Sequence, residues 1–175
     1  MYKRQREFGK ITGLVNNAGI YGPRGPVHQL EAGDISHVLD INVRGYFICA
    51  REAITRMSIK FGGMGGAIVN VSSGSARLGN PKDGVLYAAS KGAVNSLTIG
   101  LSQEVAGDGI RVNSVAPGLT ETDMPPADKL KLQGPNIPIG RAARPEEIAE
   151  AIFWLLSDKA SYTAGANIRV GGGRI

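Results

Sequence analysis

Short apolar runs rich in β-branched residues alternate along the chain with longer stretches whose apolar residues recur every three or four positions. A short run of this kind is typical of a strand that is buried on both faces, and the longer stretches are typical of amphipathic helices. The predicted strands span residues 11–16, 67–72, 110–116 and 167–170. The pattern therefore predicts an α/β fold with a doubly wound parallel sheet.

Three helices are predicted between and after these strands. The first spans about residues 35–60, the second begins near Tyr87 and ends at Gly107, and the third begins at Pro145. Two glutamates follow Pro145 in the first turn, where the helix dipole favours acidic residues. The buried face of the first helix is predicted to carry Val43, Phe47, Ala50, Ile54 and Met57.

The glycine cluster GGMGG at residues 62–66 precedes a predicted strand. A phosphate-binding loop needs the opposite order, because a strand must lead into the Gly-rich turn and the turn into a helix. We therefore predict that this cluster is a turn from a helix into a strand, with glycine supplying positive φ. The glycines at 171–173 precede no helix and make no such loop either.

Composition narrows the class of protein. A chain of 175 residues with 42% hydrophobic content suits a single domain over residues 1–175. No apolar run approaches the ~20 residues of a membrane span, which predicts a soluble, cytoplasmic protein with no membrane association. The net charge of +5 would suit nucleic acid, but the basic residues form no stripe, so we expect no such partner.

Metal binding and disulfide formation are not expected. The chain has one cysteine, Cys49, and two histidines, His28 and His37, without the spacing of a metal site. Because Cys49 lies among apolar neighbours, we predict that it is a packing residue of the core.

Tyr87 and Lys91 stand four residues apart at the start of the second helix, and so on one face of it. A nearby cation can lower the pKa of a phenol from ~10 toward neutrality, which would make the pair an acid/base group. Such pairs also occur by chance on amphipathic helices. Further segments accompany this one in order: VNNAG at 15–19, INVRGYF at 41–47, VNVSSGS at 69–75 and RVNSVAPGLTETDM at 111–124.

Taken together, these segments resemble the classical short-chain dehydrogenase/reductase family, from about residue 8 to the C-terminus. The resemblance implies a partial Rossmann-type sheet, made of strands 4 to 7 of the family with their helices. The Gly-rich first βαβ units would then be missing from an N-terminally truncated chain. At ~30 residues or more per unit, we expect the missing part to be about 60–80 residues.

The resemblance also implies catalytic roles. Tyr87 would be the acid/base, Lys91 would lower its pKa and hold the nicotinamide ribose, and Asn42 would hold a proton-relay water. Without the resemblance, an Asn within a helix is more typical of the surface. The family serine that orients the substrate would be Ser73.

The identity of that serine depends on spacing. The family has one residue fewer between its serine and tyrosine, and strict spacing selects Gly74, which has no hydroxyl. An insertion in the loop ARLGNPKDG favours Ser73, while Ser72 and Ser75 stay open as alternatives.

The implied cofactor is NAD(P), and the basic composition slightly favours NADP. The sequence TETD at 120–123 could instead cap a helix. In the resemblance, the cofactor is contacted by Asn16, Asn17, Ala18, Gly19, Tyr87, Lys91, Pro117, Gly118, Thr120 and Thr122.

The implied function is an NAD(P)-dependent oxidoreductase that transfers hydride between the nicotinamide and a small secondary alcohol or ketone. The implied assembly is a homodimer or homotetramer, formed through the helices at 35–60 and 87–107. The alternative is a catalytically inactive fragment or pseudoenzyme that acts through subunit association.

Overall fold

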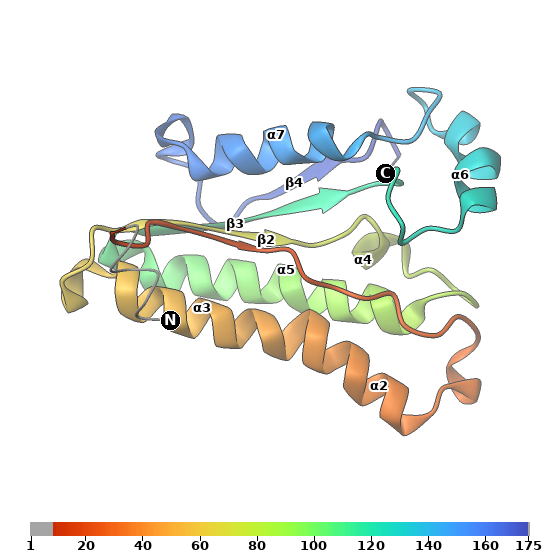
Figure 1. Cartoon of the computed structure of the whole chain (residues 1–175), viewed down its shortest axis with the longest axis horizontal. Coiled ribbons are helices and arrows are strands. Elements are labelled where there is room, and N and C mark those ends of the chain that lie inside the picture. Colours follow the sequence, from red (N-terminus) through yellow and green to blue (C-terminus); the bar gives the residue numbers. More distant parts are fainter. Residues whose placement is uncertain (1–8, 175) are drawn as a thin grey trace.

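A computed structural model of the chain describes residues 9–174 and confirms an α/β fold with a parallel sheet. The strands pair in the order β1-β2-β3-β4, all parallel, as Figure 1 shows. Their bounds lie within two residues of the predicted ones. The strands are β1 (Gly13–Asn16), β2 (Gly66–Val71), β3 (Ile110–Pro117) and β4 (Asn167–Val170).

Helices cover both faces of this sheet. The helices α3 (Gly45–Met57) and α5 (Val85–Val105) lie on one face, and α7 (Pro145–Leu156) lies on the other (Figure 1). The remaining α-helices are α2 (Ala32–Leu39), α4 (Ser75–Leu78) and α6 (Ala127–Gln133). Short 3₁₀ turns occupy Val27–Gln29, Ile59–Phe61, Ala106–Asp108, Gly134–Asn136 and Asp158–Ala160.

The strands pack a separate apolar cluster on each face, because successive side chains of a strand point to opposite sides. In β2, Ile68 belongs to the cluster under α3 and α5, and its neighbour Val69 belongs to the cluster under α7. Both side chains are fully buried. This is the burial on both faces that the apolar runs predict.

The predicted helix over 35–60 is continuous but not uniform. A π-helical segment, Asp40–Arg44, joins α2 to α3. A π turn holds more residues than an α turn, so the face that meets the core moves along the sequence. The prediction for Phe47 is consequently wrong, since it is 53% exposed and Tyr46 is buried in its place. The buried residues of the whole helix are Val38, Asn42, Tyr46, Ala50, Ala53 and Met57.

The prediction for Cys49 is wrong as well. Cys49 is exposed, on the same outward face of α3 as the exposed Ile48. Apolar neighbours in sequence do not bury a helical residue, because burial follows the face of the helix.

The turn over residues 62–66 is confirmed. Gly62, Gly65 and Gly66 have φ of 79°, 75° and 150°, and the turn leads from the end of α3 into β2. The backbone N–H of Gly65 donates to the Met57 carbonyl at 2.7 Å, and that of Gly66 donates to the Gly109 carbonyl at 2.9 Å.

Replacing Gly65 by alanine should destabilise the fold strongly. A Cβ at residue 65 would clash with the Gly109 backbone carbonyl oxygen, because the two atoms would lie 2.4 Å apart. The positive φ of residue 65 would add backbone strain. We expect a loss of about 3 kcal/mol or more in the free energy of unfolding, measured by urea titration. Gly62→Ala is the matched control, because its φ is also positive but its Cβ would meet no atom within 4 Å. It should lose about 1 kcal/mol, and equal losses in the two variants would contradict the steric argument.

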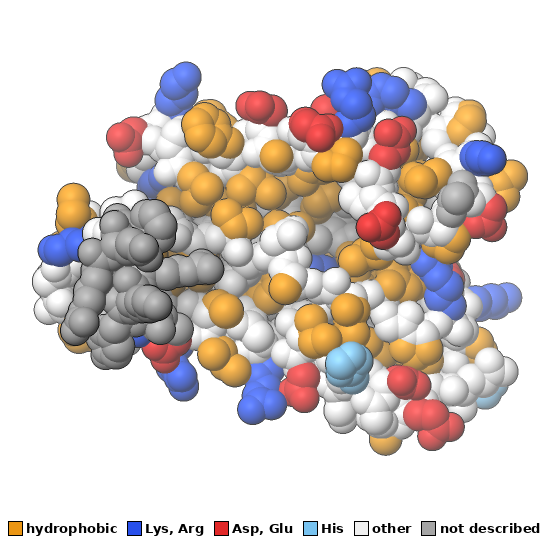
Figure 2. Space-filling model, in the orientation of Figure 1, with side chains coloured by type: hydrophobic (Ala, Val, Ile, Leu, Met, Phe, Trp, Pro, Cys, Tyr) orange, Lys and Arg blue, Asp and Glu red, His pale blue; other side chains and the backbone are white. Residues whose placement is uncertain are grey.

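The strand β1 lies at one edge of the sheet formed by the described residues. Val15 in this strand is 39% exposed, and Figure 2 shows hydrophobic side chains gathered over the middle of one face of the molecule. Among residues 9–174, no helix combines the length and the apolar character needed to cross a bilayer.

Candidate active site

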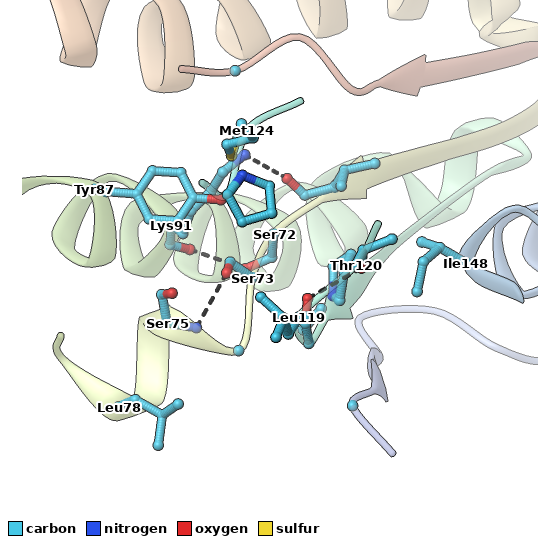
Figure 3. Close-up of a pocket in the computed structure, with 18 of the residues that line it drawn as sticks. Ser72, Ser73, Ser75, Leu78, Tyr87, Lys91, Leu119, Thr120, Met124 and Ile148 are labelled. Atoms are coloured by element: carbon cyan, nitrogen blue, oxygen red, sulfur yellow. Dashed lines mark hydrogen bonds between the residues drawn. The ribbon is translucent and has the colours of Figure 1, made fainter. Parts of the chain in front are cut away.

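A cavity of about 920 Å³ opens where the strands end at their carboxyl side (Figure 3). Open parallel sheets bind ligands at this edge. The end of β2 brings Ser72 and Ser73 to the cavity, and the end of β3 brings Pro117 and Gly118. The first turns of α5 add Tyr87 and Lys91. Segments that are distant in sequence thus meet around one hollow.

Tyr87 and Lys91 are both buried on the first two turns of α5. Lys91 Nζ donates to the Val71 carbonyl at 2.8 Å and to the Tyr46 hydroxyl at 3.2 Å. It lies 5.9 Å from the centroid of the Tyr87 ring. Burial lowers the pKa of Lys91 to about 8, because the charged form loses its hydration.

Burial also raises the pKa of Tyr87 above its ordinary value, and a hydrogen bond with Ser73 lowers it in part. The Lys91 ammonium donates to Val71 and Tyr46, and no hydrogen bond joins it to the Tyr87 phenol among the contacts of residues 9–174. The lowering of the Tyr87 pKa by Lys91 therefore stays a prediction.

The three candidate serines differ in their partners. Ser72 is buried and donates to Asn95 Oδ1 at 2.6 Å, and Ser75 Oγ accepts from Asn80 Nδ2 at 2.9 Å. Ser73 is the one of the three whose hydroxyl lowers the pKa of Tyr87. Ser73 Oγ also accepts from the Ser75 backbone N–H at 3.1 Å (Figure 3). The choice of Ser73 as the serine that orients the substrate stays a prediction.

Asn42 lies in the π-helical segment and is fully buried, unlike a surface residue. Its Oδ1 accepts from the Ile20 backbone N–H, and its Nδ2 donates to the Ile20 carbonyl, both at 2.8 Å. Nδ2 also donates to Ser90 Oγ at 3.0 Å. Asn42 therefore holds the loop after β1 against α5.

Gly19 marks the point where Asn42 and Lys91 converge. A Cβ at residue 19 would lie 3.2 Å from Lys91 Nζ and 3.3 Å from Asn42 Oδ1. A larger side chain at this position would crowd both polar atoms. The absence of a side chain at residue 19 leaves room beside both polar atoms.

The predicted cofactor residues at the end of β1 and just after it divide into two groups. Asn17 and Gly19 line the cavity, whereas Asn16 and Ala18 are not among its lining residues. Asn16 is buried, and its Nδ2 donates to Asn70 Oδ1 at 2.9 Å between β1 and β2. Adjacent residues of an extended chain point to opposite sides, so Asn16 and Asn17 face different surroundings.

The predicted cofactor residues at the end of β3 and after it all line the cavity, namely Pro117, Gly118, Thr120 and Thr122. Thr120 Oγ1 donates to the Gly118 carbonyl at 3.1 Å, and Thr122 Oγ1 accepts from the Met124 backbone N–H at 3.4 Å. The alternative that TETD caps a helix is wrong, because the next helix begins at Ala127 with Pro126 at its N-cap. The hydrogen bonds of these threonines therefore stabilise a loop that borders the cavity.

A polar cluster at the cavity, which we call the Asp83 cluster, was not predicted from the sequence. It consists of Asp83 with Tyr21, Arg24 and Lys129. The Tyr21 hydroxyl donates to Asp83 Oδ2 at 2.8 Å, and the Tyr21 ring stacks on that of Tyr87 with centroids 4.7 Å apart. Burial by itself would raise the pKa of Asp83, but hydrogen bonds from Arg24 and Lys129 outweigh it and lower the pKa to about 2. No short motif could reveal this cluster, because its members are far apart in the sequence.

The donor set of the cavity fits the nicotinamide end of a dinucleotide. Ribose hydroxyls and a carboxamide can be bound by side chains of the cavity wall. These are the ammonium of Lys91, the hydroxyls of Thr120 and Thr122 and the amide of Asn17. Among residues 9–174, no three His, Cys, Asp or Glu side chains gather closely enough to hold a metal ion.

Comparison with known proteins gives consistent matches along the chain. A family model described as enoyl-(acyl carrier protein) reductase matches residues 1–174. The chain is 53% identical over 171 residues to an uncharacterized oxidoreductase of Escherichia coli K12, YgfF, covering 94% of this chain and 68% of that protein.

Two further relatives have named activities. The chain is 42% identical to a cis-4-hydroxycyclohexanecarboxylate dehydrogenase of Sinomonas cyclohexanicum, over 99% of this chain and 69% of that protein. It is 41% identical to a 3alpha-hydroxysteroid dehydrogenase of Mediterraneibacter gnavus, over 96% of this chain and 66% of that protein. The chain thus spans about two thirds of the length of these relatives.

Proposed function

Because the chain belongs to the short-chain dehydrogenase/reductase family, we propose that it carries the active centre of an NAD(P)-dependent oxidoreductase with Tyr87 as acid/base. Its substrate is a secondary alcohol or the corresponding ketone. The observation that carries this proposal is the meeting of Tyr87, Ser73 and Lys91 at one cavity on the carboxyl edge of the sheet.

The names of two relatives support a cyclic substrate. One is named for a hydroxycyclohexanecarboxylate and another for a hydroxysteroid, and both names describe a secondary hydroxyl on a six-membered carbon ring. The cavity of about 920 Å³ has room for such a ring, and apolar side chains such as Leu78, Leu119 and Ile148 contribute to its wall (Figure 3).

Tyr87 moves the proton in this mechanism. In alcohol oxidation, the tyrosinate oxygen accepts the proton of the substrate hydroxyl, and in ketone reduction the phenol returns it to the oxygen on which negative charge develops. When bound, the nicotinamide accepts or supplies the hydride. The Ser73 hydroxyl donates a hydrogen bond to the same substrate oxygen and stabilises that charge.

Lys91 and Asn42 support this proton transfer. The ammonium of Lys91 holds the cofactor ribose and favours the anionic form of Tyr87 by its charge. Asn42 fixes the loop that carries Gly19, through its paired hydrogen bonds to Ile20, and holds a relay water beside Lys91. The nicotinamide end of the cofactor is contacted by the side chains or backbone of Asn17, Pro117, Gly118, Thr120 and Thr122.

A cofactor titration tests the proposal. NADH and NADPH are titrated into the purified chain while nicotinamide fluorescence is followed. We expect saturable binding that Lys91→Ala removes and that Lys131→Ala, an exposed lysine on α6 outside the cavity, leaves unchanged. The ratio of the two affinities measures the predicted slight preference for NADP. Absence of binding up to millimolar cofactor would favour the inactive, associating form of the chain.

A cytoplasmic homodimer or homotetramer belongs to the same proposal. The helices named for the interface carry exposed apolar side chains, with Phe47 and Ile48 on α3 and Ile99 on α5. We expect these side chains to be covered in the proposed assembly.

A further inference from the structure

The cavity wall carries far more positive than negative charge. Its charged lining residues are the basic Arg24, Arg77, Lys91, Lys129, Arg169 and Arg174 and the acidic Asp83. One carboxylate cannot neutralise this set. A hollow lined by one sign of charge raises the local concentration of ligands of the opposite sign. The cavity therefore favours an anion.

The Asp83 cluster concentrates part of this charge beside the reacting phenol. Arg24 Nη1 donates to the two Asp83 carboxylate oxygens at 2.7 and 2.9 Å, and Lys129 Nζ donates to Oδ2 at 3.0 Å. Two cations on one carboxylate leave a net charge of +1. The Arg24 guanidinium lies 4.0 Å from the centroid of the Tyr21 ring, and that ring stacks on Tyr87.

Both cations keep donors for another acceptor. Arg24 reaches Asp83 through Nη1 alone, so the fork that binds a carboxylate with two nitrogens is not used up. Lys129 Nζ has three N–H groups and spends one on Asp83. The side chains of Arg24 and Lys129 are 35% and 24% exposed. Partial burial strengthens their attraction for an anion over that of a fully hydrated charge.

Asp83 fixes these cations in place. Its carboxylate joins Arg24, in the loop after β1, to Lys129, on α6, and to the loop that precedes α5. The low pKa of Asp83 keeps it ionised throughout the working range of pH. A preorganised pair of cations loses less conformational entropy when an anion binds.

On the basis of the proposed function, we propose that the substrate is a secondary alcohol that also bears a carboxylate, and that Arg24 and Lys129 bind this carboxylate. The alcohol then faces Tyr87 and Ser73 while the acid group is held at the Asp83 cluster. Arg24 and Lys129 thus determine specificity and take no part in proton transfer.

Binding of unreactive probes tests this proposal without turnover. Cyclohexanecarboxylate and its neutral analogue cyclohexylmethanol are titrated by calorimetry into the chain and into Arg24→Gln, Lys129→Gln and Lys131→Gln. We expect the acid to bind more tightly than the alcohol, and each of the first two variants to weaken the acid by about tenfold. The affinity for cyclohexylmethanol should not change. Lys131→Gln, which removes the same charge from the same helix outside the cavity, should leave both affinities unchanged.

Three results would overturn the carboxylate site. If Arg24→Gln and Lys129→Gln weaken both probes alike, the Asp83 cluster only supports the shape of the cavity. If they weaken NADPH but not the acid, the anion that they bind is a cofactor phosphate. Lack of saturable binding of the acid to the unmodified chain is the third. Charge-dependent binding of the acid without turnover of any alcohol would support the anion site and contradict the proposed function instead.

Discussion

Tyr87→Phe is expected to lower kcat/KM for alcohol oxidation and ketone reduction by about 10²- to 10⁴-fold, the usual contribution of a positioned acid/base. The substitution removes one hydroxyl and keeps the ring that stacks on Tyr21. The affinity for NADH should therefore stay nearly unchanged, so the loss falls on the chemical step. Turnover is measured by nicotinamide absorbance with a panel of cyclic secondary alcohols, some of them carboxylated.

Tyr162→Phe is the control, because this tyrosine is fully exposed. The pH profile adds a second readout. Since burial raises the pKa of Tyr87, the tyrosinate fraction grows with pH from neutral into alkaline solution. Oxidation by the unmodified chain should accelerate over that range, whereas reduction should not. A Tyr87→Phe variant that keeps activity within about tenfold would exclude Tyr87 as the acid/base.

Lys91→Met is expected to reduce kcat/KM by about 10²-fold or more and yet to stabilise the fold near pH 7. The pKa of Lys91 is about 8 in the fold and 10.5 in an unfolded chain, because burial disfavours the charged form. Between these values the unfolded chain binds more protons, so the stability of the unmodified chain rises as pH rises from 8 to 10.5. Below pH 8 the full cost of the buried charge is present, and its removal should add on the order of 1–3 kcal/mol.

Urea unfolding at about pH 7 and about pH 10.5 measures this difference, which should shrink at the higher pH. Methionine also leaves the Val71 carbonyl without the Lys91 donor. Lys91→Gln, which keeps an N–H donor without the charge, separates the two effects. Lower stability of both variants near neutral pH would mean that the hydrogen bonds of Lys91 outweigh the cost of burying its charge.

The sheet was predictable because burial on both faces leaves a direct mark on the sequence. A strand such as β2 must be largely apolar, and its run of β-branched residues indicates a strand that is buried on both faces. The helix over 35–60 was predictable in extent but not in rotation. The π turn at Asp40–Arg44 has no signal in apolar spacing, and it moves burial from Phe47 to Tyr46.

The site residues also differ in how far the sequence predicts their positions. Tyr87 and Lys91 share one helix, so their spacing already places them on one face. The Asp83 cluster could not be foreseen, because its hydrogen bonds join residues 46 to 62 positions apart. The position of Asn16 depends on side-chain alternation next to a turn, which fixes the direction of a side chain only once the end of the strand is known.

The pairing order of the strands has a consequence for how the chain folds during its synthesis on the ribosome. Each strand pairs with the one made before it, so β2 adds to β1, β3 to β2 and β4 to β3. Synthesis at ~5–20 residues per second lets the layer under α3 and α5 assemble first. Val69 and Val115, on the opposite face, become buried only after α7 has been synthesised. The nascent chain therefore passes through a stage in which this apolar face of the sheet is uncovered.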